Sequence, residues 1–297
     1  MRLISIILIC FTSLAGLGAG RAFGTPFEAS TIPDDVEVVG HLDVDALRQT
    51  QLFTALGGQA AIDRAIAQAP ADLVPLARVL AGSIRGVSFW GADDHGAVQV
   101  QTRDAGALAA ILAKAPVKRL GTVDGTTTYT SAEKGDDHGF LAVVGDTLIL
   151  ADSAESLAHS IHVLTGHATT LAGSRKLPAQ MRSGVFVFVT IGDDALASIK
   201  RSAQAKVLQL AIKSIVMDVG ESAGILTATG RAEMGNAEAL QKARSILDGL
   251  RAMASLSDDV TARALLDDVT ITASGLALDV VVKVPVAKLA KTIELHD

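Results

Sequence analysis

One stretch of the chain occurs twice in outline, and this echo limits what the chain can fold into. Residues 83–112 read SIRGVSFWGADDHGAVQVQTRDAGALAAIL, and residues 214–247 read SIVMDVGESAGILTATGRAEMGNAEALQKARSIL. Each stretch has an apolar run, a turn containing glycine, an alternating run, and a segment with leucine or isoleucine at helical spacing. The pattern predicts a β-hairpin followed by an amphipathic helix, and it predicts this unit twice.

The correspondence extends beyond these two stretches. Leu108 corresponds to Leu240, and the triplet DAL at residues 45–47 recurs at residues 194–196. Length differences between the copies fall in turns and connecting segments, where insertions are tolerated. We therefore predict an α+β fold made by tandem duplication, each copy being an antiparallel sheet with helices packed on one face. The expected segments are a leader at 1–24, a first module at 25–170 and a second module at 171–297. A linker over 167–176 is expected across the boundary between the two modules.

The N-terminus has the layout of a secretory signal peptide. Arg2 supplies a positive charge, residues 3–17 are apolar and uncharged, and Ala22 and Gly24 are small residues placed for cleavage before Thr25. An uncleaved anchor is the alternative, because residues 3–20 reach the lower length limit for a membrane span. We expect cleavage, no stable membrane span afterwards, and an exported protein of the periplasm or the extracellular space.

Composition narrows the function classes further. The single cysteine, Cys10, lies in the expected leader, so the mature chain has no thiol for a disulfide or for thiolate chemistry. The formal net charge is −6 and no basic stripe is present, which argues against a nucleic-acid partner. No phosphate-binding glycine loop or dinucleotide fingerprint occurs, and we expect no cofactor.

One motif suggests catalysis. Residues 220–224 read GESAG, which matches the G-x-S-x-G elbow of α/β-hydrolases, and Ser222, Asp267 and His296 follow the chain order of such a triad. The elbow needs a helix after the serine, whereas residues 225–229 (ILTAT) are strand-like. His296 is also the penultimate residue, where fraying is expected. We therefore predict a hairpin turn here, and keep a serine hydrolase using Ser222 as the alternative.

Histidines suggest a second kind of site. Residues 152–164 predict a helix, and His159 and His162 lie one turn apart on its outer face, close enough to share zinc or copper. His138 is a third candidate ligand. Exposed histidines without a metal are the default interpretation, so we expect no metal. Residues 122–130, ahead of the helix, are rich in threonine and predict a strand.

The tetrapeptide DDHG occurs at residues 93–96 and again at residues 136–139. Its carboxylates and imidazole are metal-ligand types. Asp and Gly are also favoured in turns for backbone reasons alone, so solvated turn residues are the expected interpretation.

Near its start the mature chain reads PDDVEVVGHLDVDAL, from Pro33 to Leu47. With the export signal and the repeated unit, this order resembles uncharacterised families of exported bacterial proteins with duplicated α+β modules. The resemblance implies no activity and no site residues. We expect a non-enzymatic envelope protein that binds an unknown protein or small-molecule ligand, and a cleft between the copies is the candidate place for a small ligand.

Overall fold

The computed structural model describes residues 24–68, 74–92, 95–113, 117–131, 139–174, 177, 181–200, 211–255 and 268–294. The expected leader, His138, Asp267 and His296 lie outside these residues. No described helix is long and apolar enough to cross a membrane.

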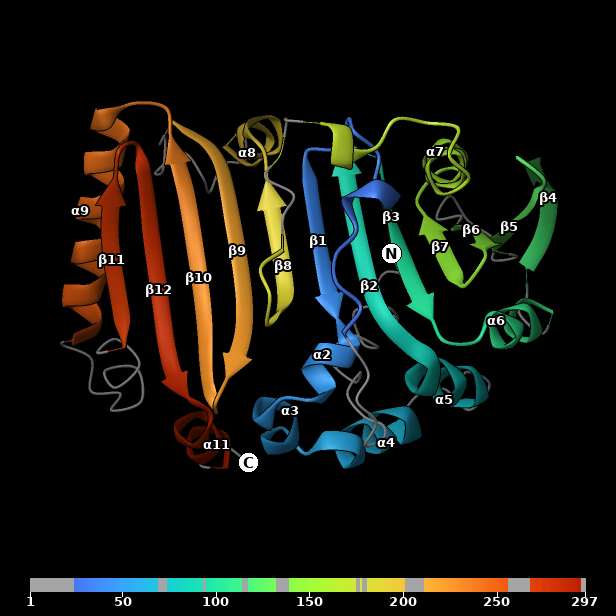
Figure 1. The fold of residues 1–297 in the computed structure, drawn as a ribbon, viewed down its shortest axis with the longest axis horizontal. Coiled ribbons are helices and arrows are strands. Elements are labelled where there is room, and N and C mark those ends of the chain that lie inside the picture. Colours follow the sequence, from blue (N-terminus) through green and yellow to red (C-terminus); the bar gives the residue numbers. More distant parts are fainter. Residues whose placement is uncertain are drawn as a thin grey trace.

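The described chain forms an α+β fold around one twelve-stranded antiparallel sheet with the order β11-β12-β10-β9-β8-β1-β2-β3-β7-β6-β5-β4 (Figure 1). The strands are β1 (Val38–Asp43), β2 (Ile84–Ala92), β3 (His95–Thr102), β4 (Val117–Val123), β5 (Thr126–Ser131), β6 (Phe140–Val144), β7 (Thr147–Ala151), β8 (Val185–Ile191), β9 (Ile212–Ser222), β10 (Ile225–Met234), β11 (Val269–Ser274) and β12 (Ala277–Pro285). The α-helices are α2 (Val44–Arg48), α3 (Gln51–Ala55), α4 (Gly58–Gln68), α5 (Val74–Ser83), α6 (Ala105–Leu112), α7 (Ala154–Leu164), α8 (Asp193–Lys200), α9 (Ala237–Ser255) and α11 (Val286–Glu294).

The two echoing stretches form the same elements. Residues 84–112 give β2, β3 and α6, and residues 212–255 give β9, β10 and α9. At the centre of the sheet β1 pairs with β8 in antiparallel register, which makes the sheet continuous from one half of the chain to the other. Outwards from this pair, the first half runs β2, β3, β7, β6, β5, β4 and the second runs β9, β10, β12, β11.

The first half carries one hairpin beyond this common order. β4 and β5 pair across a two-residue turn of Asp124 and Gly125, both with positive φ. Asp-Gly is a favoured pair for such a turn, because both residues tolerate the left-handed conformation. The prediction of a strand over residues 122–130 is therefore confirmed for residues 126–130, which lie in β5, and wrong at Asp124 and Gly125, where the turn separates β5 from the end of β4.

The helices lie on both faces of the sheet, so the expectation of helices on one face is also wrong. Leu108 of α6 packs in a cluster with Leu148, whereas Leu157 of α7 packs in another cluster with Ile149. Leu148 and Ile149 are consecutive residues of β7, and consecutive strand residues point to opposite faces.

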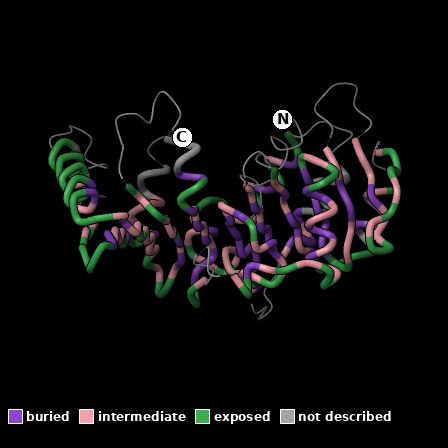
Figure 2. The backbone as a smooth tube through the Cα atoms, turned by 90° about the horizontal axis from the view of Figure 1, so that it is seen from above, coloured by how far each residue is buried: buried purple, intermediate pink, exposed green. Residues whose placement is uncertain are grey.

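Burial is uneven along the sheet. Two large clusters of buried side chains cover both faces of the sheet in the first half and reach β8, while α9 packs over the ends of β10 and β12 with a small cluster around Met234 and Leu278. Figure 2 shows the mostly exposed helix α9 at the far left. The first half therefore contains most of the interior.

Candidate functional site

Ser222 is the last residue of β9, and Ala223 and Gly224 form a two-residue turn before β10. Both turn residues have positive φ, 51° and 75°. The predicted hairpin is confirmed, and the helix that a serine elbow needs after its nucleophile is replaced by a strand. The other two residues of the hydrolase alternative, Asp267 and His296, lie outside the described residues.

The neighbouring Glu221 joins the two halves of the chain. Its carboxylate oxygens accept hydrogen bonds from the backbone N–H groups of Gln51 and Leu52, each at 2.8 Å. These groups open helix α3, where free N–H donors and the helix dipole favour a carboxylate. The β9–β10 turn is further tied to α11, because the N–H of Val286 donates to the carbonyl of Gly224 at 2.9 Å.

A pocket of about 370 Å³ opens beside this contact. The first half contributes Gln49, Thr50 and Gln51 to its wall, and the second half contributes Phe186, Glu221 and Gly224. Of the described residues that line it, none carries a positive charge. Figure 1 shows the β9–β10 turn, α3 and α11 together at the lower edge of the sheet. The pocket therefore lies where the two halves meet.

The two histidines expected on α7 have separate environments. The ring of His159 meets the Trp90 ring edge-on at a centroid distance of 6.0 Å, and its Nδ1 lies 3.9 Å from a carboxylate oxygen of Asp35. His162, one turn further on, points to Asp124. The candidate ligands His159 and His162 therefore do not meet at one metal position. His138 lies outside the described residues.

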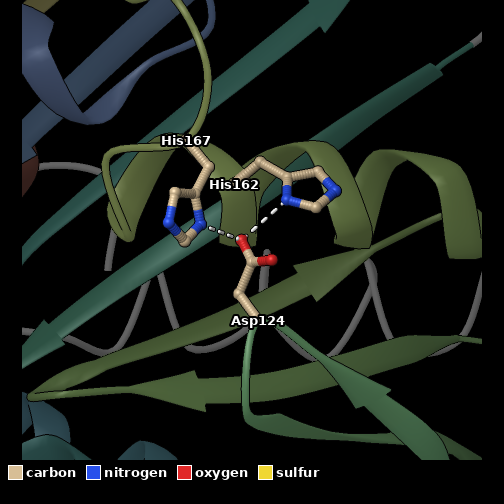
Figure 3. Close-up of side chains that lie close together, drawn as sticks. All are labelled: Asp124, His162 and His167. Carbon is tan, nitrogen blue, oxygen red and sulfur yellow. Dashed lines mark hydrogen bonds and ion pairs between the residues drawn. The ribbon is translucent and has the colours of Figure 1, made fainter.

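A different group of three side chains meets instead. Nδ1 of His162 and Nδ1 of His167 each lie 2.7 Å from the same carboxylate oxygen of Asp124, as Figure 3 shows. The Thr165 hydroxyl lies 2.8 Å from that oxygen. The hydrogen bonds from His167, then His162, then Thr165 hold the pKa of Asp124 well below its ordinary value. The carboxylate is therefore ionised at neutral pH.

Asp124 was missed from the sequence because its position depends on the turn between β4 and β5. The Asp-Gly pair was the available signal, since it is a hairpin pair between runs of threonine. His167 follows α7 in the expected linker, and the chain turns there after Gly166, which has a φ of 80°. That turn brings His167 back beside the last turn of the helix.

The buried carboxylate of Asp45 is surrounded by arginines that stabilise the fold. Asp45 has a side chain only 1% exposed and meets Arg48, Arg85 and Arg103. Arg48 is 4% exposed and also donates to the carbonyls of Ala81 and Ile84 at 2.7 and 2.9 Å. Burying a charge is costly unless it is paired and hydrogen-bonded, so these contacts stabilise the buried Asp45 and Arg48. The side chains of Arg85 and Arg103 border solvent, at 38% and 40% exposed.

His41 is a buried ionisable group in the central strand β1. It is 2% exposed, and its ring nitrogens lie 2.9 Å from the Ser88 hydroxyl and 2.8 Å from the Thr25 carbonyl oxygen. Burial lowers the pKa of His41, although the Thr25 carbonyl and Asp43 act in the opposite direction. The imidazole is therefore held in its neutral form at neutral pH.

Comparison with known proteins gives the fold alone. No family model matches the chain, and a search of curated proteins finds no match. Among solved structures, crystal forms III, I and IV of TP0453 are similar, with TM-scores of 0.54, 0.51 and 0.53 and 12% sequence identity in each case. The matches cover 91%, 92% and 93% of this chain and 97%, 98% and 99% of those chains.

Proposed function

We propose that this chain is an exported, non-enzymatic binding protein that holds a small polar ligand in the pocket between its two halves. The single observation that carries the proposal is the pocket itself. Its wall is built from Gly24, α2, α3 and the loop between the two helices on one side, and from β8 with the preceding Gly184, the end of β9 and the β9–β10 turn on the other. Ligand sites commonly form where two structural units meet.

The strand order that the two halves share supports this arrangement. The strand order outwards from the β1–β8 pair is the same in both halves as far as β6 and β11, once the β4–β5 hairpin is set aside. Two copies joined at equivalent strands create a junction that neither copy has alone. The export signal expected at residues 1–24 places this junction in the cell envelope or outside the cell.

The chemistry of the wall limits the ligand. Gln49 and Gln51 contribute side-chain amides. The Thr50 hydroxyl is already bonded to Leu47 and Phe53, and the Glu221 carboxylate, which accepts from the backbone of α3, adds a negative charge. Such a wall offers hydrogen bonds but no described positive charge, so it favours neutral or cationic polar molecules over anions. Phe186 contributes an apolar surface at the second-half side.

A thermal-shift screen of the mature chain with amino acids, sugars, betaines and polyamines tests the proposal. A ligand at about 100 times its Kd stabilises the folded state by about 2.7 kcal/mol, which raises the Tm by several degrees. Gln51→Trp fills the pocket, and Thr54→Trp is the matched control, because Thr54 is exposed on the same short helix but does not line the pocket.

The expected result is a ligand that stabilises the wild type and Thr54→Trp but not Gln51→Trp. A screen without a stabilising compound counts against small-ligand binding. A shift that survives in Gln51→Trp places the binding site elsewhere. Labelling by a serine-directed phosphonate that disappears in Ser222→Ala would favour the hydrolase alternative instead.

A further inference from the structure

Asp124, His162 and His167 come from two separate segments of the chain that meet at one end of the sheet. Asp124 lies at the tip of the β4–β5 hairpin, His162 lies in the last turn of α7, and His167 follows that helix. The three candidate ligand atoms lie within 4.8 Å of one another. In Figure 3 the two imidazole rings approach the carboxylate from different directions. The group is therefore already assembled by the fold.

The donor set matches one class of ion. Two imidazole nitrogens and one carboxylate oxygen are ligands that zinc, copper and nickel accept, whereas calcium and magnesium prefer oxygen alone. A tetrahedral zinc centre has bonds of about 2.0–2.2 Å, so its ligand atoms lie roughly 3.4 Å apart. The observed 2.7 Å separations between each Nδ1 and the carboxylate oxygen must therefore widen by somewhat less than 1 Å.

The side chains have room for that movement. The side chain of His162 is 41% exposed and that of His167 is 62% exposed, so both rings border solvent. Asp124 is 20% exposed, and its backbone is fixed by the hairpin turn. Solvent on the open side can supply water for the remaining coordination position, as in zinc centres with three protein ligands.

The position also favours a cation. His162 lies in the last turn of α7 and Thr165 is the C-terminal cap, so the negative end of the helix dipole points at the cluster. The Asp124 carboxylate adds a full negative charge. Both rings already present Nδ1 to the centre, and metal binding needs that nitrogen without its proton, which then resides on Nε2.

We propose that Asp124, His162 and His167 bind one divalent transition-metal ion of the zinc type, with water completing its coordination. The site is separate from the pocket between the two halves and does not depend on the ligand proposed there. The ion would fasten the β4–β5 hairpin to the end of α7 more firmly than the hydrogen bonds alone.

Titration of the mature chain with Zn²⁺, followed by calorimetry, tests the proposal. The expected result is one equivalent of Zn²⁺ per chain, with affinity reduced at least tenfold in Asp124→Asn, His162→Gln and His167→Gln. The matched control is His159→Gln, on the same helix but against Trp90, and it should bind as the wild type does. Gln51→Trp should also bind normally, which separates this test from that of the pocket.

His167→Gln keeps the test independent of folding, because this residue is outside the helix and largely exposed. Co²⁺ adds a second measurement: its visible absorption bands should have the intensity of a four-coordinate centre and disappear in His167→Gln. Absence of Zn²⁺ uptake would overturn the proposal and leave the cluster as a hydrogen-bonded clamp only. Uptake that persists unchanged in all three variants would overturn it too.

Discussion

The two halves of this chain share a strand order but differ in what surrounds the strands. In the first half both faces of β2, β3 and β7 are covered, whereas most residues of β9, β10 and β11 in the second half are partly or fully exposed. The first half also has the β4–β5 hairpin, and no described strand occupies that place between α9 and β11. Equivalent positions in the halves therefore have different physical roles.

The clearest instance is the repeated DAL triplet. Asp45 is buried among three arginines, while its counterpart Asp194 is exposed in the first turn of α8. The candidate metal group follows the same rule. It depends on the hairpin that only the first half has among the described residues, and on a histidine pair at the end of α7. The two halves share a strand order but do not share these sites.

The largest expected effect comes from removing the buried charge in one half. Asp45→Asn should lower the free energy of unfolding by about 3–5 kcal/mol, because the buried Arg48 loses its counter-charge. Asp194→Asn should change it by less than about 0.5 kcal/mol, since this residue is exposed. Urea unfolding of both variants measures the difference. Equal effects would show that the two halves are stabilised alike.

A smaller effect is expected at the contact that joins the halves. Glu221→Ala should cost about 1–2 kcal/mol, because two N–H groups at the start of α3 lose their acceptor. Glu221→Gln should cost less, since one carbonyl oxygen remains to accept. The urea midpoint and slope of each variant give the comparison. A Glu221→Ala variant as stable as the wild type would mean that the two hydrogen bonds to Glu221 do not stabilise the contact between the halves.

The smallest effect concerns pH. The pKa of His41 is lowered in the folded chain by burial, so below the ordinary value of 6.5 the unfolded chain binds more protons than the folded one. Stability should therefore be complete above that value and fall as the pH decreases below it, by no more than about 1.4 kcal/mol per pH unit from this group.

Unfolding free energies at pH 7.5 and 5.5 measure this slope. It should be reduced in His41→Gln and kept in His95→Gln, which changes an exposed histidine at the start of β3. A wild-type chain equally stable at both pH values would contradict the expected role of His41.

Much of the local structure could be predicted from the sequence, because it depends on neighbouring residues. The hairpin at residues 220–224 followed from the strand-like ILTAT after Ser222. Asp43 caps α2 by accepting from the N–H of Ala46 at 2.8 Å, which is a common role for aspartate ahead of a helix. The pairing of strands far apart in the chain could not be predicted from the sequence. The pairing of β1 with β8 joins strands from the two halves, and no local pattern reports it.

The candidate site shows the same limit. His162 was identified from its helical position, but its partners Asp124 and His167 depend on a turn and on a chain reversal. Likewise, Gly40 has no local signal for its role. The Phe89 ring lies over it, and a Cβ on Gly40 would come within 2.3 Å of ring atoms.

Native mass spectrometry of the chain purified from the cells that produce it is the decisive test of a ligand site between the halves. The expected mass is that of residues 25–297 plus one small polar molecule, which should be lost in Gln51→Trp but not in Thr54→Trp. A zinc adduct would be distinguished by its own mass and by its loss in His167→Gln. The bare mass of the chain, or the same small-molecule adduct in wild type and Gln51→Trp, would contradict a ligand site between the halves.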